Sequence, residues 1–95
     1  ELRGIAYFYL SEAAYEIGEF EISIEYSKKA SSINYEIEKW VLPYAAYVTA
    51  KSNYKIGKFG RSREFLEIAE NNNDFEFQES IEALVNNLNR KLDVL

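Results

Sequence analysis

The side chains of this sequence that could do catalytic chemistry are serines and carboxylates, because its 95 residues include no His and no Cys. A serine becomes a nucleophile only beside an activating base, and the sequence offers no imidazole to serve as one. Glu19, Glu21 and Glu25 have the spacing of a polar helix face, where carboxylates are normally solvated. We therefore expect the chain not to be an enzyme and to have no catalytic residues.

Metal and cofactor sites are not expected either. Zinc sites of the usual kind need Cys or His ligands. The four glycines, at positions 4, 18, 57 and 60, are not clustered as they are in loops that hold phosphate groups. The sequence predicts no metal ligands and no cofactor.

The net charge of −5 limits the classes of partner. Proteins that bind nucleic acid or anionic membranes normally present a basic surface, so we expect neither as a partner. No apolar run approaches the roughly 20 residues that a membrane-spanning helix needs. We expect a protein partner and a cytoplasmic location, with the nucleus or the periphery of mitochondria or lipid droplets as alternatives.

The elements that would position a binding site belong to an internal repeat. A shift of 39 residues aligns eight identical pairs, which we interpret as a duplication. The pairs are Ala6 and Ala45, Tyr15 and Tyr54, Ile17 and Ile56, Gly18 and Gly57, Phe20 and Phe59, Ser23 and Ser62, Glu25 and Glu64, and Ala30 and Ala69.

Each repeat unit has the pattern of a helical hairpin. In unit one, residues 2–33, apolar side chains recur every three or four positions on both sides of Gly18. Gly18 allows the left-handed backbone that reverses the chain. Unit two, residues 41–70, repeats this pattern around Gly57, and residues 34–40 form an insertion between the units.

A fifth helix is expected over residues 74–93, with Asp74 as its N-cap. Its apolar stripe should pack on unit two as a cap, although an exposed stripe would make it a partner helix. The stripe consists of Phe77, Ile81, Leu84, Val85, Leu88 and Leu92. The expected fold is a single all-α domain of five helices without β-structure.

The hairpins resemble the tetratricopeptide repeat (TPR). In unit one the residues at the signature positions are Tyr7, Leu10, Ser11, Gly18, Glu19, Phe20, Ser23, Tyr26 and Ala30. Unit two has Ala50, Gly57, Phe59, Ser62, Phe65 and Ala69, but departs from the signature at Ala46, Thr49 and Lys58. The resemblance implies an α-solenoid, in which small residues let paired helices approach closely.

A second resemblance lies in the segment from Glu38 to Tyr47. Its Trp-x-x-Pro-Tyr-Ala motif is similar to the C-terminal end of the TPR family that contains fungal inclusion-body clearance proteins and animal tetratricopeptide repeat protein 39. This likeness implies that the chain is a piece of a larger scaffold protein. The roles it implies are protein-aggregate clearance and lipid-droplet contacts.

By analogy with the TPR, the first helix of each unit lines a concave groove. We predict that this groove binds a partner peptide or helix through its aromatic side chains, with charged residues setting the orientation. The predicted groove residues are Ile5, Phe8, Glu12, Tyr15 and Glu16 in unit one, and Tyr44, Tyr47, Lys51, Tyr54 and Lys55 in unit two. A simpler interpretation is that these Glu and Lys residues bridge each other across the helices.

Two other interpretations stay open. The chain could be a structural end-piece that completes a larger solenoid or self-associates, since Leu2, Ile5 and Tyr9 begin an apolar face abruptly. The aromatic residues could instead line a lipid or small-molecule pocket, although core packing explains them equally well. Trp40, in the insertion, is expected to pack against a second helix of a unit or the next hairpin. Binding of chaperone C-terminal tails is disfavoured, because Glu12 stands where such repeats normally have Asn and would repel a carboxylate.

Overall fold

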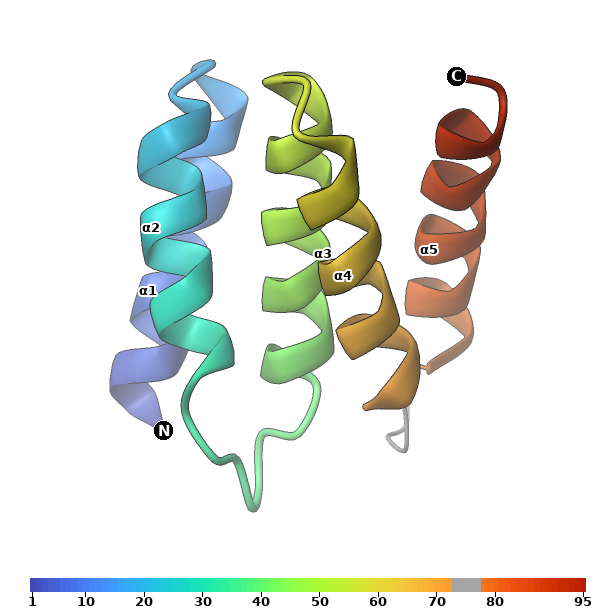
Figure 1. Ribbon diagram of the computed structural model, residues 1–95. Coiled ribbons are helices and arrows are strands. Elements are labelled where there is room, and N and C mark those ends of the chain that lie inside the picture. The colour runs from blue at the N-terminus through green and yellow to red at the C-terminus, as the bar shows by residue number, and fades with distance from the viewer. Residues whose placement is uncertain (73–77) are drawn as a thin grey trace.

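The computed structural model describes residues 1–72 and 78–95, and these form five α-helices (Figure 1). The helices are α1 (Leu2–Glu16), α2 (Phe20–Ser31), α3 (Val41–Lys55), α4 (Phe59–Asn71) and α5 (Gln78–Asp93). The described residues contain no β-strand, so the predicted all-α fold of five helices is confirmed. None of these helices is both long and apolar enough to cross a bilayer.

The two hairpin turns have the same geometry. Gly18 and Gly57 have φ angles of 83° and 80°, in the left-handed region that glycine adopts without strain. Each turn is followed by the same backbone bond: the N–H of Glu19 donates to the Ala14 carbonyl, and that of Lys58 donates to the Asn53 carbonyl. The expected left-handed turns at both glycines are therefore confirmed.

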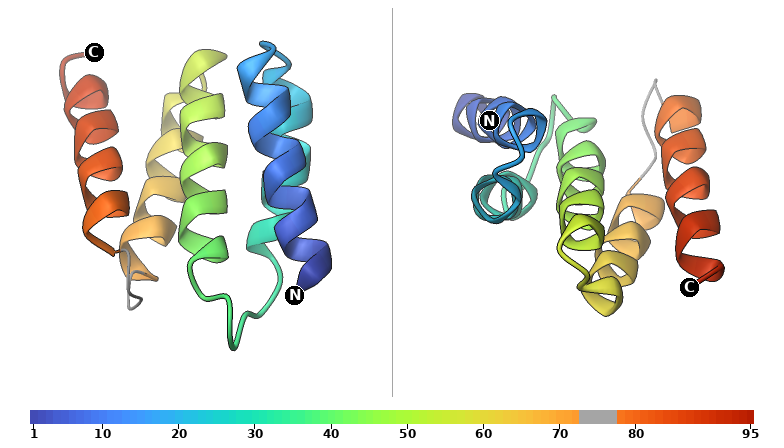
Figure 2. Two further views of the ribbon diagram at one scale, coloured as in Figure 1. Left: turned by 180° about the vertical axis from the view of Figure 1, so that it is seen from behind. Right: turned by 90° about the horizontal axis from the view of Figure 1, so that it is seen from above.

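The five helices form two layers (Figure 2). One layer contains α1, α3 and α5, and the other contains α2 and α4, so that helices successive in the chain pack against each other. As a result, three helices that are far apart in sequence share one face of the molecule.

Buried hydroxyl groups hold the helices close together. The Ser23 hydroxyl donates to the Ser11 carbonyl at 2.8 Å within the first hairpin, and the Ser62 hydroxyl donates to the Ala50 carbonyl at 2.8 Å within the second. Between the hairpins, Ser27 and Thr49 share a hydrogen bond of 2.6 Å, and Ser52 donates to Ser23 at 3.1 Å. Small side chains at these positions permit close helix packing while their polar atoms stay hydrogen-bonded.

The last helix covers the second hairpin. Four of its side chains are buried in one hydrophobic cluster with Leu66 and Ala69 of α4. These four are Ile81, Val85, Leu88 and Leu92. Leu84 is more exposed and faces the layer of α1 and α3. Asp74 and Phe77, which were expected to start the helix and its stripe, lie outside the described residues. The predicted packing of the stripe on unit two is thus confirmed for its four buried members and not for Leu84.

The insertion between the hairpins is tied to the first helix. Tyr35 is buried and its hydroxyl donates to the Ala30 carbonyl at 2.6 Å. The Glu1 carboxylate accepts hydrogen bonds from the backbone N–H groups of residues 36, 37 and 38 at 2.9–3.3 Å. These bonds fix the path of the chain into Trp40, which immediately precedes α3.

Candidate functional site

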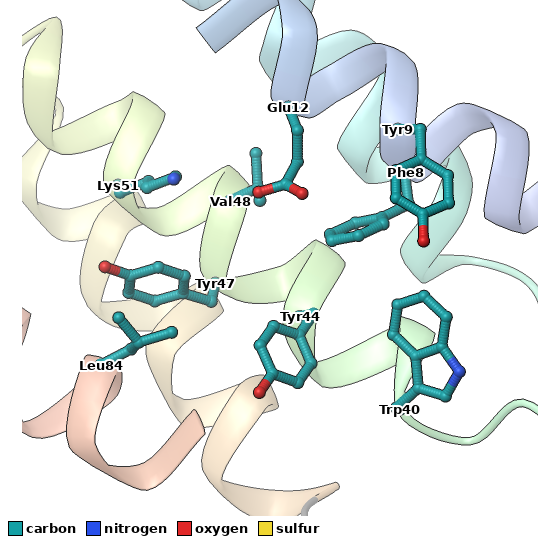
Figure 3. A pocket seen from close by; sticks show the side chains of 9 residues that line it. All are labelled: Phe8, Tyr9, Glu12, Trp40, Tyr44, Tyr47, Val48, Lys51 and Leu84. Atoms are coloured by element: carbon teal, nitrogen blue, oxygen red, sulfur yellow. The ribbon is translucent and has the colours of Figure 1, made fainter. Parts of the chain in front are cut away.

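A pocket of about 560 Å³ opens on the face that α1, α3 and α5 share (Figure 3). The helix α1 contributes three of its side chains, α3 and the residue before it contribute five, and α5 contributes one. They are Phe8, Tyr9, Glu12, Trp40, Tyr44, Tyr47, Val48, Lys51 and Leu84. We call this the aromatic pocket.

Three rings of the aromatic pocket meet at steep angles. The Phe8 and Trp40 rings lie 5.5 Å apart at 82°, and the Trp40 and Tyr44 rings lie 6.2 Å apart at 72°. The centroids of Phe8 and Tyr44 are 6.5 Å apart, at 71°. Such edge-to-face contacts are favourable between aromatic rings and hold them in place. The Trp40 indole is held further by donating from Nε1 to the Glu38 carboxylate at 2.7 Å.

The charged wall of the aromatic pocket consists of Glu12 and Lys51. The Lys51 Nζ lies 4.0 Å from the Tyr15 ring centroid and 5.5 Å from that of Tyr47. Burial lowers the pKa of Lys51, whereas Glu12 and Glu16 act in the opposite direction by stabilising its charge. Among the described residues, neither carboxylate forms a direct ion pair with Lys51, so the simple bridging arrangement is not present there.

A second, smaller pocket of about 100 Å³ continues the same face towards the hairpin turns. It is lined by three lysines, Lys51, Lys55 and Lys91, which we call the lysine end of the groove. Burial raises the pKa of both Tyr15 and Tyr47, so their hydroxyl groups stay protonated well above neutral pH. The groove thus changes from an aromatic region beside Glu12 to a cationic region beside Lys55 and Lys91.

The structure brings most of the predicted groove residues together on this face. Those in the aromatic pocket are Phe8, Glu12, Tyr44, Tyr47 and Lys51, and Tyr15, Tyr54 and Lys55 join the last two in the second pocket. Glu16 lines neither pocket but acts on Lys51 through its charge. Ile5 packs instead against the core cluster around Val41 and Ala45.

Several residues of the groove were not predicted. The Trp40 ring contacts Phe8 of α1 and Tyr44 of α3, which are the first helices of the two units. We had expected contacts with a second helix or with the next hairpin. Leu84, Asn87 and Lys91 come from α5, which we expected to act as a cap or as a partner helix but not to line this groove. The signal in the sequence was their spacing of three and four residues, which places them on one face of the fifth helix. When successive helices alternate between two layers, the fifth helix joins the layer of the first and the third. Tyr9, Val48 and Leu88 were also missed.

In the part of the chain that the structure describes, no group of three or more acidic residues could hold a metal ion. Comparisons of the chain with models of protein families, with curated proteins and with solved structures found no match.

Proposed function

We propose that the chain is a protein-interaction module that holds a segment of a partner protein in the groove formed by α1, α3 and α5. The observation that carries this proposal is the convergence of aromatic rings and opposite charges on one face (Figure 3). Aromatic side chains supply contact area at low entropic cost, and separated charges fix the direction in which a segment binds.

The repeated hairpin supports a TPR-like scaffold role. The turn glycines, the serine-to-carbonyl bonds and the ring pairs Tyr15–Phe20 and Tyr54–Phe59, with centroids 5.3 and 5.6 Å apart, all recur between the two units. These features fit the small-residue signature that resembles the TPR. We propose a non-enzymatic scaffold of the cytoplasm, and the resemblance of its insertion suggests aggregate clearance or lipid-droplet contacts as the setting.

The test is selection of binding peptides from a random display library on the immobilised chain. Peptides that bind in the groove should lose affinity for Tyr44→Ala and Tyr47→Ala variants. The matched control is Tyr26→Ala, because Tyr26 is also half-buried but lies on α2 in the other layer and stacks on Tyr7. Circular dichroism checks that each variant is folded. Failure to select any peptide, or peptides insensitive to both groove variants, would contradict the proposal.

A second candidate role is helix stacking on α1. Its exposed apolar residues form a stripe, which we call the α1 outer stripe: Leu2, Ala6, Tyr9, Leu10, Ala13 and Ile17. The shift of 39 residues maps Leu2, Ala6 and Ala13 onto Val41, Ala45 and Ser52, all 0% exposed beside α2. The α1 outer stripe is therefore the equivalent of a surface that α3 buries against a helix. It supports the end-piece role, with another helix or a second copy as the covering partner.

Sedimentation of the chain over a wide concentration range tests the self-association form of this role. A mass that rises with concentration and returns to that of a monomer in a Leu10→Lys variant would support it. Glu25→Lys, a change at an exposed position of α2, is the control. A monomeric mass at all concentrations would contradict it.

A further inference from the structure

The exposed positions of α1 are spaced symmetrically about the middle of the helix. Within residues 2–17, every exposed residue has an exposed counterpart at the same distance on the other side of the midpoint between Tyr9 and Leu10. The pairs are Leu2 and Ile17, Arg3 and Glu16, Ala6 and Ala13, and Tyr9 and Leu10. A twofold axis through the midpoint exchanges the two ends of the helix, so a surface with this spacing can face a second copy of itself.

The charges on this surface are opposite at its two ends. The structure describes α1 in full, and the charged residues at its exposed positions are Arg3, near the N-terminus, and Glu16, at the C-terminus. Within the described part of the chain neither forms an ion pair, although the charge of Glu16 stabilises that of Lys51. An antiparallel pair of α1 helices places each Arg3 beside the Glu16 of the other copy, whereas a parallel pair places like charges side by side. Charge complementarity therefore favours the antiparallel pair.

The equivalent surface of α3 already binds an antiparallel helix. The helices α2 and α3 run in opposite directions and pack against each other (Figure 1). The shift of 39 residues maps Ala6 onto Ala45, which is buried in this contact. It maps Ala13 onto Ser52, whose hydroxyl donates to Ser23 of α2 at 3.1 Å. Because small side chains let helices approach closely, the two alanines permit the same approach to α1.

The larger apolar side chains beside the alanines supply the area that pairing would remove from water. These side chains are between 48% and 84% exposed, and they are Leu2, Tyr9, Leu10 and Ile17. Two helices, each about 22 Å long, form a smaller contact than the ~800 Å² per partner of a standard interface. The pair should therefore be weak and should form at high protein concentration.

We propose that two copies of this chain pair through their α1 helices, antiparallel about a twofold axis at the midpoint of the α1 outer stripe. This inference rests on the second candidate role above and names the partner that covers the stripe. In the pair, Ala6 of each copy faces Ala13 of the other, and at each end the Arg3 guanidinium of one copy lies beside the Glu16 carboxylate of the other. A second copy is favoured over an unrelated helix, because an unrelated helix would require no symmetry of spacing or charge in α1.

The first test is disulfide cross-linking between copies, because the chain has no Cys and an introduced one reports on a single position. Ala6→Cys and Ala13→Cys variants are mixed in a glutathione redox buffer, with one of them isotope-labelled so that mass spectrometry separates crossed from same-variant dimers. In the antiparallel pair the two copies of either residue lie about 10 Å apart along the helix, beyond the ~4.4–6.8 Å between Cα atoms that a disulfide spans. We expect crossed dimers to exceed same-variant dimers by at least about fivefold.

The control for cross-linking is Glu67→Cys. Glu67 is exposed on α4, which does not contact α1 among the described helices. An excess of same-variant dimers would show a parallel pair, and a crossed yield no higher than that of Glu67→Cys would show that α1 does not pair. Either result overturns the inference.

Charge reversal tests the two ends of the interface by sedimentation equilibrium at up to about 1 mM protein, where a weak pair is populated. Arg3→Glu and Glu16→Arg should each weaken pairing by at least about threefold, because each places like charges side by side. The double variant should recover to within about twofold of the parent chain, because the ion pairs return in reversed order. Arg61→Glu and Glu67→Arg on α4 are the matched controls, since they change the net charge equally at exposed positions away from α1. A folded double variant that pairs as weakly as the single variants would contradict the inference.

The outcomes separate this inference from the roles proposed above. A mass that rises with concentration without crossed cross-links would overturn the antiparallel pair and leave self-association standing. A monomeric mass throughout, with no cross-link above the control, would overturn both. The groove proposal is decided independently by the peptide selection, whose variants lie on α3 at Tyr44 and Tyr47.

Discussion

The helices α1 and α3 occupy equivalent places in their hairpins but have different surroundings. They are both 15 residues long, but nine residues of α3 are buried and only four of α1. The reason is their neighbours: α3 contacts all four other helices, and α1 contacts only α2 and α3. The repeat pattern thus specifies the hairpin, whereas the place in the stack specifies which helix faces are buried. Equivalent substitutions should therefore have unequal effects.

The largest difference is expected at the identical pair Ala6 and Ala45. Ala45 is 0% exposed between α2 and α3, so Ala45→Leu should lower the free energy of unfolding by about 1–3 kcal/mol through overpacking. Ala6 is exposed, so Ala6→Leu should change it by less than about 0.5 kcal/mol. Urea unfolding of both variants measures the comparison. Equal losses would show that α1 is covered in solution as α3 is.

At the turn glycines the two hairpins should respond alike. Gly18→Ala and Gly57→Ala each place a side chain on a left-handed residue, which costs about 1–2 kcal/mol. No heavy atom lies within 4 Å of the added Cβ at either site, so the cost should be conformational only. Gly60→Ala is the control, because Gly60 lies in α4 without a positive φ and should lose no stability. Thermal or urea unfolding measures the loss of stability in each variant. Losses that differ by more than about 1 kcal/mol between Gly18→Ala and Gly57→Ala would contradict the equivalence of the two turns.

Substitutions of the buried serines should again destabilise the two hairpins unequally, by a smaller difference in the free energy of unfolding. Ser62→Ala removes one hydrogen bond, to the Ala50 carbonyl, at a cost of about 0.5–1.5 kcal/mol. Ser23→Ala removes the equivalent bond and also the acceptor of the Ser52 hydroxyl, so its loss should be greater. A Ser23→Ala, Ser52→Ala double variant should recover part of that excess, because no unpaired hydroxyl then remains at Ser52. Additive losses would argue against the contact between the two hairpins.

The smallest effect on stability is expected at the residues that immediately precede α1 and α3. These are Glu1 and its equivalent in the repeat, Trp40. Hydrogen bonds from the N–H groups of Glu38 and Glu36 lower the pKa of Glu1 below its ordinary value of 4.5. A carboxylate with a lowered pKa stabilises the fold above its unfolded pKa, and this stabilisation is lost as the pH falls through the folded value. Glu1→Gln should therefore be less stable than the parent chain at pH 6, and the difference should shrink as the pH falls below 4.5 and through the lowered pKa of Glu1.

Urea unfolding of both proteins between pH 2.5 and 7 measures this dependence. Glu36→Gln is a suitable control, because its backbone N–H still donates to Glu1 while one exposed carboxylate is removed. A constant difference between Glu1→Gln and the parent chain across this range would show that the carboxylate charge is not what holds the insertion.

The hairpins could be predicted because their determinants are local. Spacings of three and four residues define each apolar face, and the glycine that ends each first helix lies at the same place in both units. The exposure of the α1 outer stripe could not be predicted from such local patterns. Leu10 and Thr49 are equivalent by the repeat, yet Leu10 is 48% exposed and Thr49 0%, because only Thr49 has a helix packed over it.

The candidate site was predictable only in part. Glu12, Tyr47 and Lys51 follow from the helical face that each first helix should present. Trp40 and Leu84 could not be placed by the same reasoning, because one lies in the insertion and the other in the fifth helix. Their approach to Phe8 and Tyr47 depends on how separate segments pack, which periodicity within one helix does not report.

By itself, the sequence determined the two hairpins, their left-handed turns and an acidic chain without imidazole or thiol chemistry, since each of these depends on residue type or on neighbours within a few positions. The tertiary structure decided which helices share a face and which charges lie beside which rings. The aromatic pocket therefore exists only after α1, α3 and α5 have packed side by side, because no single helix presents more than part of its wall.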